Sequence, residues 1–72
     1  MIRSKLKNRR VCLGFTQADI AQSAEIDRGY YANIENGKRN CSFYVWLRIL
    51  KALEVPEAEF VDYVKSDNEK GA

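Results

Sequence analysis

The sequence predicts an all-α domain, and three observations lead to that prediction. No stretch alternates polar and apolar residues with a period of two for long, so strands are not indicated. Apolar residues recur instead at helical spacing, in segments bounded by glycine, proline or capping residues. The composition, with 46% hydrophobic and 31% charged residues, is typical of a globular protein rather than a disordered one. We therefore expect five helices within one domain, residues 1–65.

The first expected helix covers residues 2 to about 12. Ile2, Leu6 and Val11 fall at helical spacing and predict its apolar face, with the basic residues of the segment on the other side. Gly14 is expected to end this helix, because glycine readily adopts the left-handed conformation that closes a helix.

Capping residues set the bounds of the next two helices. Thr16 and Asp19 form a variant of the capping box, which predicts a second helix over residues 17–24. Asp27 is then a suitable N-cap for a third helix, which we expect over residues 28–36. The glycine that follows is expected to stop it.

The last two expected helices begin at a serine and a proline. Ser42 can cap a fourth helix over residues 43–53, and Pro56 sets the start of a fifth helix that reaches about residue 65. Residues 66–72 carry no apolar side chain larger than alanine, so we expect them to form a flexible tail.

The second and third helices are separated by only three residues, which forces a sharp turn. Two short helices joined in this way form a helix-turn-helix, whose second helix enters the major groove of DNA and presents its N-terminal residues to base edges. The third helix is therefore predicted to read bases. The residues expected to do so are Arg28, Gly29, Tyr30, Ala32 and Asn33.

These residues suit contacts with DNA, although some have a second interpretation. The guanidinium of Arg28 can bond guanine O6 and N7 together, or it can bind a phosphate or pair with Asp27. Gly29 removes bulk, so that the helix can approach the groove closely. The Tyr30 hydroxyl can reach a phosphate or a base edge, whereas Tyr31 is expected to point inward.

The string TQADIAQSAEIDRGYYANIENGK, residues 16–38, resembles the XRE or Cro and phage-repressor family of DNA-binding domains. Within that family, the segment IDRGYYANIENGKRN is most similar to the controller proteins of restriction-modification systems. The resemblance implies a five-helix, lambda-repressor-like fold that binds double-stranded DNA. The matching positions are Thr16, Gln17, Ala21, Ile26, Ile34, Glu35, Asn36, Gly37, Asn40, Ser42, Leu47, Leu53 and Val55.

The resemblance also assigns roles outside the start of the third helix. It implies that Glu35 turns inward and pairs with Arg10 on the first helix. Glu25 stands where the family often has glycine in the turn, and Cys41 stands where it often has proline, so both positions depart from the pattern. Contacts with the DNA backbone are implied for Thr16, Gln17, Asn36, Lys38 and Arg39.

The last two helices carry more apolar side chains than a domain of this size needs, which indicates a partner surface. One core face is expected on the fourth helix: Phe43, Trp46, Leu47, Leu50 and Leu53. The remaining apolar residues are expected to join two protomers about a two-fold axis, with the third helices about 34–36 Å apart on a palindromic site. They are Tyr44, Val45, Ile49, Phe60, Val61, Tyr63 and Val64.

Charge is distributed unevenly along the chain. Residues 1–51 hold ten basic and four acidic residues, whereas residues 52–72 hold two basic and six acidic ones. The basic residues near the N-terminus can form a face that meets phosphates, or they can simply be solvated. They are Arg3, Lys5, Lys7, Arg9 and Arg10.

Several functions are disfavoured by what the sequence lacks. It has no histidine and no glycine-rich phosphate loop, so we expect neither an enzyme nor a bound metal or cofactor. No apolar run approaches the roughly 18 residues that a membrane span requires, so we expect a cytoplasmic protein. Cys12 and Cys41 are expected to remain reduced thiols.

The sequence thus predicts a transcriptional regulator, while the direction of its action stays open. Such a protein can repress by occupying a promoter, or it can activate by touching RNA polymerase. The alternative is a protein-interaction module such as an antitoxin, which would bind another chain through the fourth and fifth helices.

Overall fold

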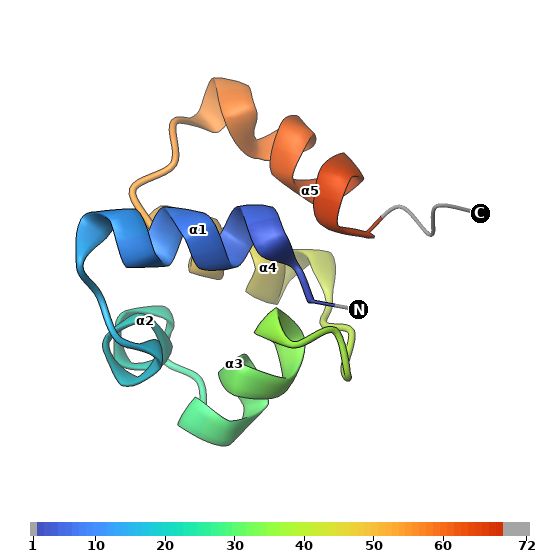
Figure 1. Ribbon diagram of the computed structural model, residues 1–72. Helices are drawn as coiled ribbons and strands as arrows, with labels where there is room; N and C mark the ends of the chain where they lie inside the picture. Colours follow the sequence, from blue (N-terminus) through green and yellow to red (C-terminus); the bar gives the residue numbers. More distant parts are fainter. Residues whose placement is uncertain (1, 69–72) are drawn as a thin grey trace.

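The computed structural model describes residues 2–68, and within that range it contains five α-helices and no strand. In Figure 1, α1 crosses the front of the molecule, with α5 above it and with α2 and α3 below. The all-α prediction is confirmed. The elements are α1 (Ser4–Leu13), α2 (Gln17–Ala24), α3 (Arg28–Glu35), α4 (Phe43–Ala52), a single 3-10 turn η1 (Glu57–Glu59) and α5 (Phe60–Asn68).

The predicted N-caps of α2, α3 and α4 are all present. The Thr16 side chain accepts from the amide of Asp19 at 3.0 Å, and the Asp19 carboxylate accepts from the amide of Thr16 at 2.9 Å, which completes a capping box. Asp27 and Ser42 cap α3 and α4 in a similar way. Gly14 follows α1 with φ 79°, the left-handed conformation expected of it.

The end of the chain differs from the expectation. The 3-10 turn η1 occupies the start of the expected fifth helix, and α5 continues to Asn68. Residues 66–68 of the expected flexible tail are therefore helical, and residues 69–72 lie outside the described residues.

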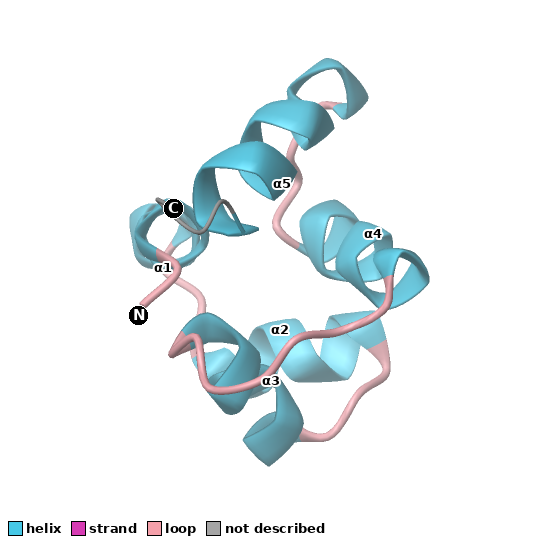
Figure 2. Ribbon diagram, turned by 90° about the vertical axis from the view of Figure 1, so that its right-hand side faces the viewer, coloured by secondary structure: helices cyan, strands magenta, loops and turns pink. Residues whose placement is uncertain are grey.

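The helices surround a common core. α2 packs against both α3 and α4, while α1 packs against α5 and α3. Figure 2, a quarter turn from Figure 1, shows α1 and α4 on opposite sides of this arrangement, with α5 at one end. The buried apolar side chains are those of Leu6, Ile20, Ala21, Ala24, Tyr31, Ile34, Trp46, Ile49, Leu50, Leu53, Val55 and Tyr63.

The predicted apolar face of α1 is wrong except at one residue. Leu6 is buried, but Ile2 is exposed and Val11 is 57% exposed. Ile2 precedes the first helical residue, Ser4, so helical spacing does not apply to it. Val11 is five residues after Leu6, which places it about 140° further round the helix.

The predicted core face of α4 also needs correction. Ile49 is fully buried together with Trp46, Leu50 and Leu53, a set at the i, i+3, i+4 and i+7 positions of one helix face. Phe43 is the first residue of α4, lies ahead of this buried set and is 65% exposed. Ile49 therefore belongs to the core, and Phe43 lies at the surface.

Candidate nucleic-acid interface

The turn between α2 and α3 is formed by a residue in the left-handed conformation. Glu25 has φ 61°, and its amide closes α2 by donating to the carbonyls of Ala21 and Gln22. The guanidinium of Arg48 on α4 donates to both the carbonyl and the carboxylate of Glu25, at 3.3 Å each. Glu25 is thus a non-glycine residue in the left-handed conformation, and its exposed pair with Arg48 contributes little stability.

Gly29 lies close to the N-cap in the first turn of α3. One carboxylate oxygen of Asp27 accepts from the amide of Gly29 at 2.9 Å and from the amide of Tyr30 at 3.2 Å. A Cβ at position 29 would lie 3.1 Å from that oxygen. A side chain at position 29 would therefore require the Asp27 carboxylate to shift by a few tenths of an ångström. The predicted role of Gly29 in approaching a groove stays a prediction.

The Asp27 carboxylate caps the N-terminus of α3 and does not form an ion pair with Arg28. Arg28 is exposed at the start of α3, and it has no ion-pair partner among the residues that the structure describes. The structure therefore does not contain the ion pair between Arg28 and Asp27 that the sequence allowed. Its guanidinium is available to an anion or a base.

The other predicted base-reading residues are exposed or half-buried. Gly29 and Asn33 are exposed, whereas Tyr30 and Ala32 are half-buried. Tyr31 is fully buried, as predicted, because it shares the inward side of α3 with Ile34. α3 thus presents an exposed face of mostly polar residues and a buried apolar face.

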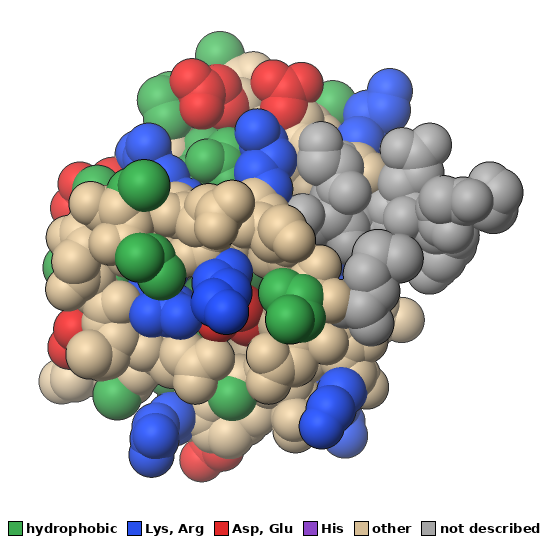
Figure 3. Space-filling view, in the orientation of Figure 1, with side chains coloured by type: hydrophobic (Ala, Val, Ile, Leu, Met, Phe, Trp, Pro, Cys, Tyr) green, Lys and Arg blue, Asp and Glu red, His purple; other side chains and the backbone are tan. Residues whose placement is uncertain are grey.

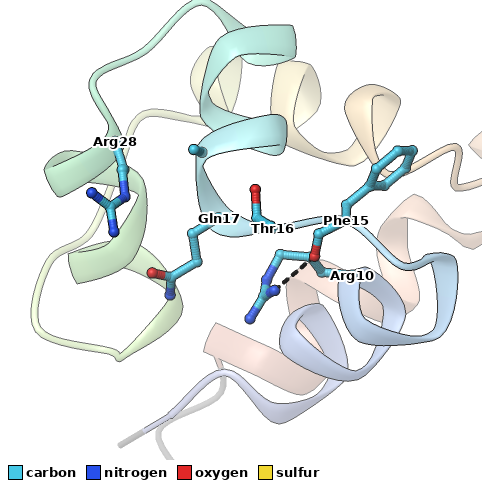
Figure 4. A pocket seen from close by; sticks show the side chains of 6 residues that line it. Arg10, Phe15, Thr16, Gln17 and Arg28 are labelled. Atoms are coloured by element: carbon cyan, nitrogen blue, oxygen red, sulfur yellow. Dashed lines mark hydrogen bonds between the residues drawn. The ribbon is translucent and has the colours of Figure 1, made fainter.

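A cleft of about 520 Å³ lies where α1, α2 and the start of α3 meet. Figure 4 shows the side chains of Arg28 from α3 and Gln17 from α2 directed into it, with the guanidinium of Arg10 close to Gln17. The structure thus brings together Arg28, predicted to contact bases, and Gln17, predicted to contact the DNA backbone. The lining residues are Arg10, Phe15, Thr16, Gln17, Ala18 and Arg28.

Glu35 lies at the centre of a buried polar network behind this cleft. Its side chain is only 1% exposed, and it pairs with Arg10, as the resemblance implied. Arg10 donates to both carboxylate oxygens, at 2.8 and 3.0 Å, while the Tyr31 hydroxyl and the Gln17 amide donate at 2.8 and 3.0 Å. One acidic side chain therefore holds groups from α1, α2 and α3 together.

The network shifts the pKa values of its members. Burial acts to raise the pKa of the Glu35 carboxyl, but the bonds from Arg10, Gln17 and Tyr31 outweigh burial, and the pKa is lowered. The bond to Glu35 raises the pKa of Arg10. Burial, followed by the charge of Glu35, raises the pKa of the Tyr31 hydroxyl well above its usual value. Glu35 is therefore ionised and Tyr31 neutral at neutral pH.

The bond between Gln17 and Glu35 was not expected from the sequence. An amide NH₂ group has two donors, and Gln17 uses one of them for Glu35. The second N–H donor remains for an acceptor such as a phosphate oxygen. Glu35 thereby orients a residue that the sequence assigned to the DNA backbone alone.

Neither interpretation of the basic residues near the N-terminus, a face that meets phosphates or a solvated face, describes the three arginines, which bond within the protein. Arg3 is only 6% exposed, and its guanidinium donates to the Ile34 and Arg39 carbonyls and to the Asn40 side chain. Arg9 donates to the Leu53 and Glu54 carbonyls at the end of α4, and Arg10 pairs with Glu35. These arginines satisfy carbonyls and a carboxylate of distant segments, which local sequence patterns do not reveal. Lys5 and Lys7 are exposed.

The loop after α3 carries the remaining residues predicted to contact the DNA backbone. Asn36, Lys38 and Arg39 are all exposed, and Gly37 turns the chain with φ 78°. The guanidinium of Arg39 lies 5.7 Å from the centre of the Tyr30 ring. The loop therefore lies beside the exposed face of α3.

The predicted dimer surface is only partly exposed. Tyr44 and Val61 are exposed, whereas Val45, Phe60 and Val64 are half-buried against the core. Two predicted members do not belong to such a surface, because Ile49 and Tyr63 are both buried in the core. Phe43, assigned to the core from the sequence, is exposed instead.

Acidic and basic side chains are interspersed on the face shown in Figure 3. Acidic groups stand at the top, over α5, with basic side chains close by, and further basic side chains project at the lower edge, by α3. No helix within residues 2–68 is long and apolar enough to cross a bilayer.

Comparison with known proteins assigns this arrangement to a family. The helix-turn-helix family model matches residues 6–60. A Bacillus subtilis (strain 168) protein described as the uncharacterized HTH-type transcriptional regulator YqaF is 47% identical over 49 residues, which are 68% of this chain. The match spans 64% of YqaF, less than two thirds of its length.

Solved structures agree with that assignment. The wild-type restriction-modification controller protein C.Esp1396I superposes with a TM-score of 0.77 at 31% identity, over 94% of this chain and 87% of that one. A tyrosine-to-phenylalanine mutant of that controller, bound to its highest affinity operator site, also superposes with a TM-score of 0.77, at 29% identity over 93% and 90% of the two chains. The chain therefore belongs to the helix-turn-helix family, of the XRE type that its sequence resembles, and it shares the fold of a restriction-modification controller protein.

Proposed function

We propose that the protein is a sequence-specific transcriptional regulator that binds double-stranded DNA in the cytoplasm as a homodimer on a palindromic operator, as a restriction-modification controller would. The observation that carries the proposal is the exposed Arg28 at the start of α3, beside the cleft that holds Gln17. The likeness to a controller protein solved on its operator supports the same function.

The residues around α3 divide between two kinds of DNA contact. Arg28 and Asn33 are exposed on the helix that would enter the major groove, where they would bond base edges. The N-terminus of α2 would bind a phosphate in the cleft through Thr16 and Gln17, because helix N-termini favour anions. The loop after α3 would bind a second stretch of backbone. Its contact residues are Asn36, Lys38 and Arg39.

The exposed apolar residues of α4 and α5 would join two protomers. Phe43, Tyr44 and Val61 are the most exposed large hydrophobic residues of these helices. A second copy of the chain would cover them and would place the two α3 helices on successive major grooves. The acidic groups over α5 fit a surface that stays away from DNA.

Selection of bound duplexes from a random DNA pool tests the proposal. Purified protein is expected to enrich a palindrome whose half-sites are about one helical turn apart, at near-physiological salt. Binding that stays unselective and falls steeply with salt would contradict sequence-specific recognition. The protein-interaction alternative, such as an antitoxin, would then become the better account.

A further inference from the structure

The side chain of Arg39, in the loop after α3, lies over a residue in the first turn of that helix. Arg39 follows α3, whereas Tyr30 lies in the first turn of α3, nine residues earlier in the chain. The guanidinium carbon of Arg39 lies 5.7 Å from the centre of the Tyr30 ring, within the range of a cation–π contact. The charge of Arg39 is thereby held close to the exposed face of α3.

The main chain of Arg39 is anchored on both sides. Its amide donates to the Asn33 carbonyl at 3.2 Å, and its carbonyl accepts from Nη1 of Arg3 at 3.1 Å. Arg3 is itself buried, and its guanidinium lies 5.7 Å from the centre of the Trp46 ring. The base of the Arg39 side chain is therefore fixed to the core, and only the side chain beyond Cα remains to be positioned.

Tyr30 provides a rigid platform for that side chain. It is half-buried, and its ring packs against the hydrophobic core while remaining open to Arg39. An exposed arginine without such a contact would sample many rotamers, and ordering them on binding lowers affinity. A cation–π contact of this kind does not use up the N–H donors of the guanidinium, so they stay available for an anion.

We propose that Tyr30 is a positioning residue whose ring holds the guanidinium of Arg39 in place for a DNA phosphate. The inference rests on the proposed DNA-binding function. It changes the role of Tyr30, since the sequence suggested that the Tyr30 hydroxyl would itself contact DNA. Tyr30 then contributes to affinity through Arg39 and carries no base preference of its own.

Fluorescence anisotropy with four variants tests this role. The variants are Tyr30→Phe, Tyr30→Leu, Arg39→Ala and the double change Tyr30→Leu with Arg39→Ala. Titrations use the selected duplex and an unrelated duplex at low salt, because a phosphate contact does not depend on sequence. Tyr30→Phe keeps the ring face, and Tyr30→Leu keeps apolar bulk without it.

The expected results follow from the cation–π contact between Arg39 and Tyr30. Tyr30→Phe should bind both duplexes like the wild type, whereas Tyr30→Leu should bind both about two- to fivefold more weakly. Arg39→Ala should lower the salt slope of binding by about one. Adding Tyr30→Leu to Arg39→Ala should cause no further loss, because the guanidinium that the ring supports is already gone.

Two results would overturn the inference. If Tyr30→Phe bound as weakly as Tyr30→Leu, the hydroxyl and not the ring face would carry the contact. If the losses from Tyr30→Leu and Arg39→Ala were additive, the two residues would act separately. Thermal unfolding of each variant checks that it is folded, and Tyr30→Met replaces Tyr30→Leu if the latter is not. Failure of the proposed function would be distinct, because the wild type would then show no preference for any duplex.

Discussion

Arg10 on α1 and Glu35 at the end of α3 form a two-pronged ion pair, with Nε and Nη2 of the arginine 2.8 and 3.0 Å from the two carboxylate oxygens. The same carboxylate accepts from Gln17 at the start of α2. The relative placement of three helices therefore depends on one buried acidic side chain. Two of those helices, α2 and α3, form the helix-turn-helix.

The Glu35→Ala variant should unfold at a much lower urea concentration than the wild type. It leaves the Arg10 guanidinium and the Tyr31 hydroxyl without their buried acceptor, which costs about 3–5 kcal/mol for a well-buried pair. Urea unfolding followed by helical circular dichroism measures the change.

A matched control separates the lost charge pair from lost packing. The double change Arg10→Met with Glu35→Leu removes both charges together and should cost far less than Glu35→Ala, because no unpaired charge remains. Both variants leave the Tyr31 hydroxyl without its acceptor, so equal losses would show that this hydroxyl or packing, and not the unpaired charge, sets the effect.

Stability should fall in acid because of the same carboxylate. The folded-state pKa of Glu35 is lowered, so its contribution is complete above the unfolded pKa of about 4.3 and is lost as the pH falls through the folded pKa. Melting temperatures measured from about pH 7 to about pH 2 should therefore drop below about pH 4. The drop in melting temperature should be smaller for the Glu35→Gln variant, which has no charge to lose at this position. An identical drop in that variant would show that other carboxylates cause it.

Arg28→Ala should relax sequence preference at one base position. A bidentate contact with guanine provides about 1–3 kcal/mol of discrimination, and Arg28 is exposed where that contact would form. The measurement is the affinity for the selected duplex and for variants changed at each position. Uniform weakening on all duplexes, with a salt slope lower by about one, would make Arg28 a phosphate contact instead.

Val61→Glu should prevent dimer formation if α5 contributes to the interface. Val61 is an apolar residue of α5 whose side chain is 63% exposed. A glutamate at this position would have to lose its hydration on association, which opposes dimer formation. Val11→Glu on α1 is the matched control, since Val11 is also an exposed valine in a helix but lies outside the proposed interface. Sedimentation at micromolar concentration should show a monomer for the first variant and a dimer for the second.

The sequence predicted the parts of the fold that depend on neighbouring residues. The caps of Thr16, Asp27 and Ser42 occur as expected, because each one bonds an amide only two or three residues away. The pair of Arg10 and Glu35 was expected only through the family resemblance. Its partners lie 25 residues apart, so no local pattern predicts it.

The errors concern side chains whose surroundings come from distant segments. Arg3 and Arg9 look like part of a basic face in the sequence, but they bond the carbonyls at the ends of α3 and α4. Ile49 and Tyr63 look like surplus apolar residues, but neighbouring helices bury them. Periodicity shows which residues share a helix face, and the packing of the other helices decides which face is buried.

The central claim is that two copies of α3 read successive major grooves, and half-site spacing tests it most directly. Binding of purified protein is measured on the selected palindrome, on the palindrome with about five base pairs inserted at its centre, and on a single half-site. The account predicts tight binding to the first duplex alone, because the insertion turns one half-site about half a helical turn away. Equal affinity for all three duplexes would contradict a dimer that reads both half-sites together.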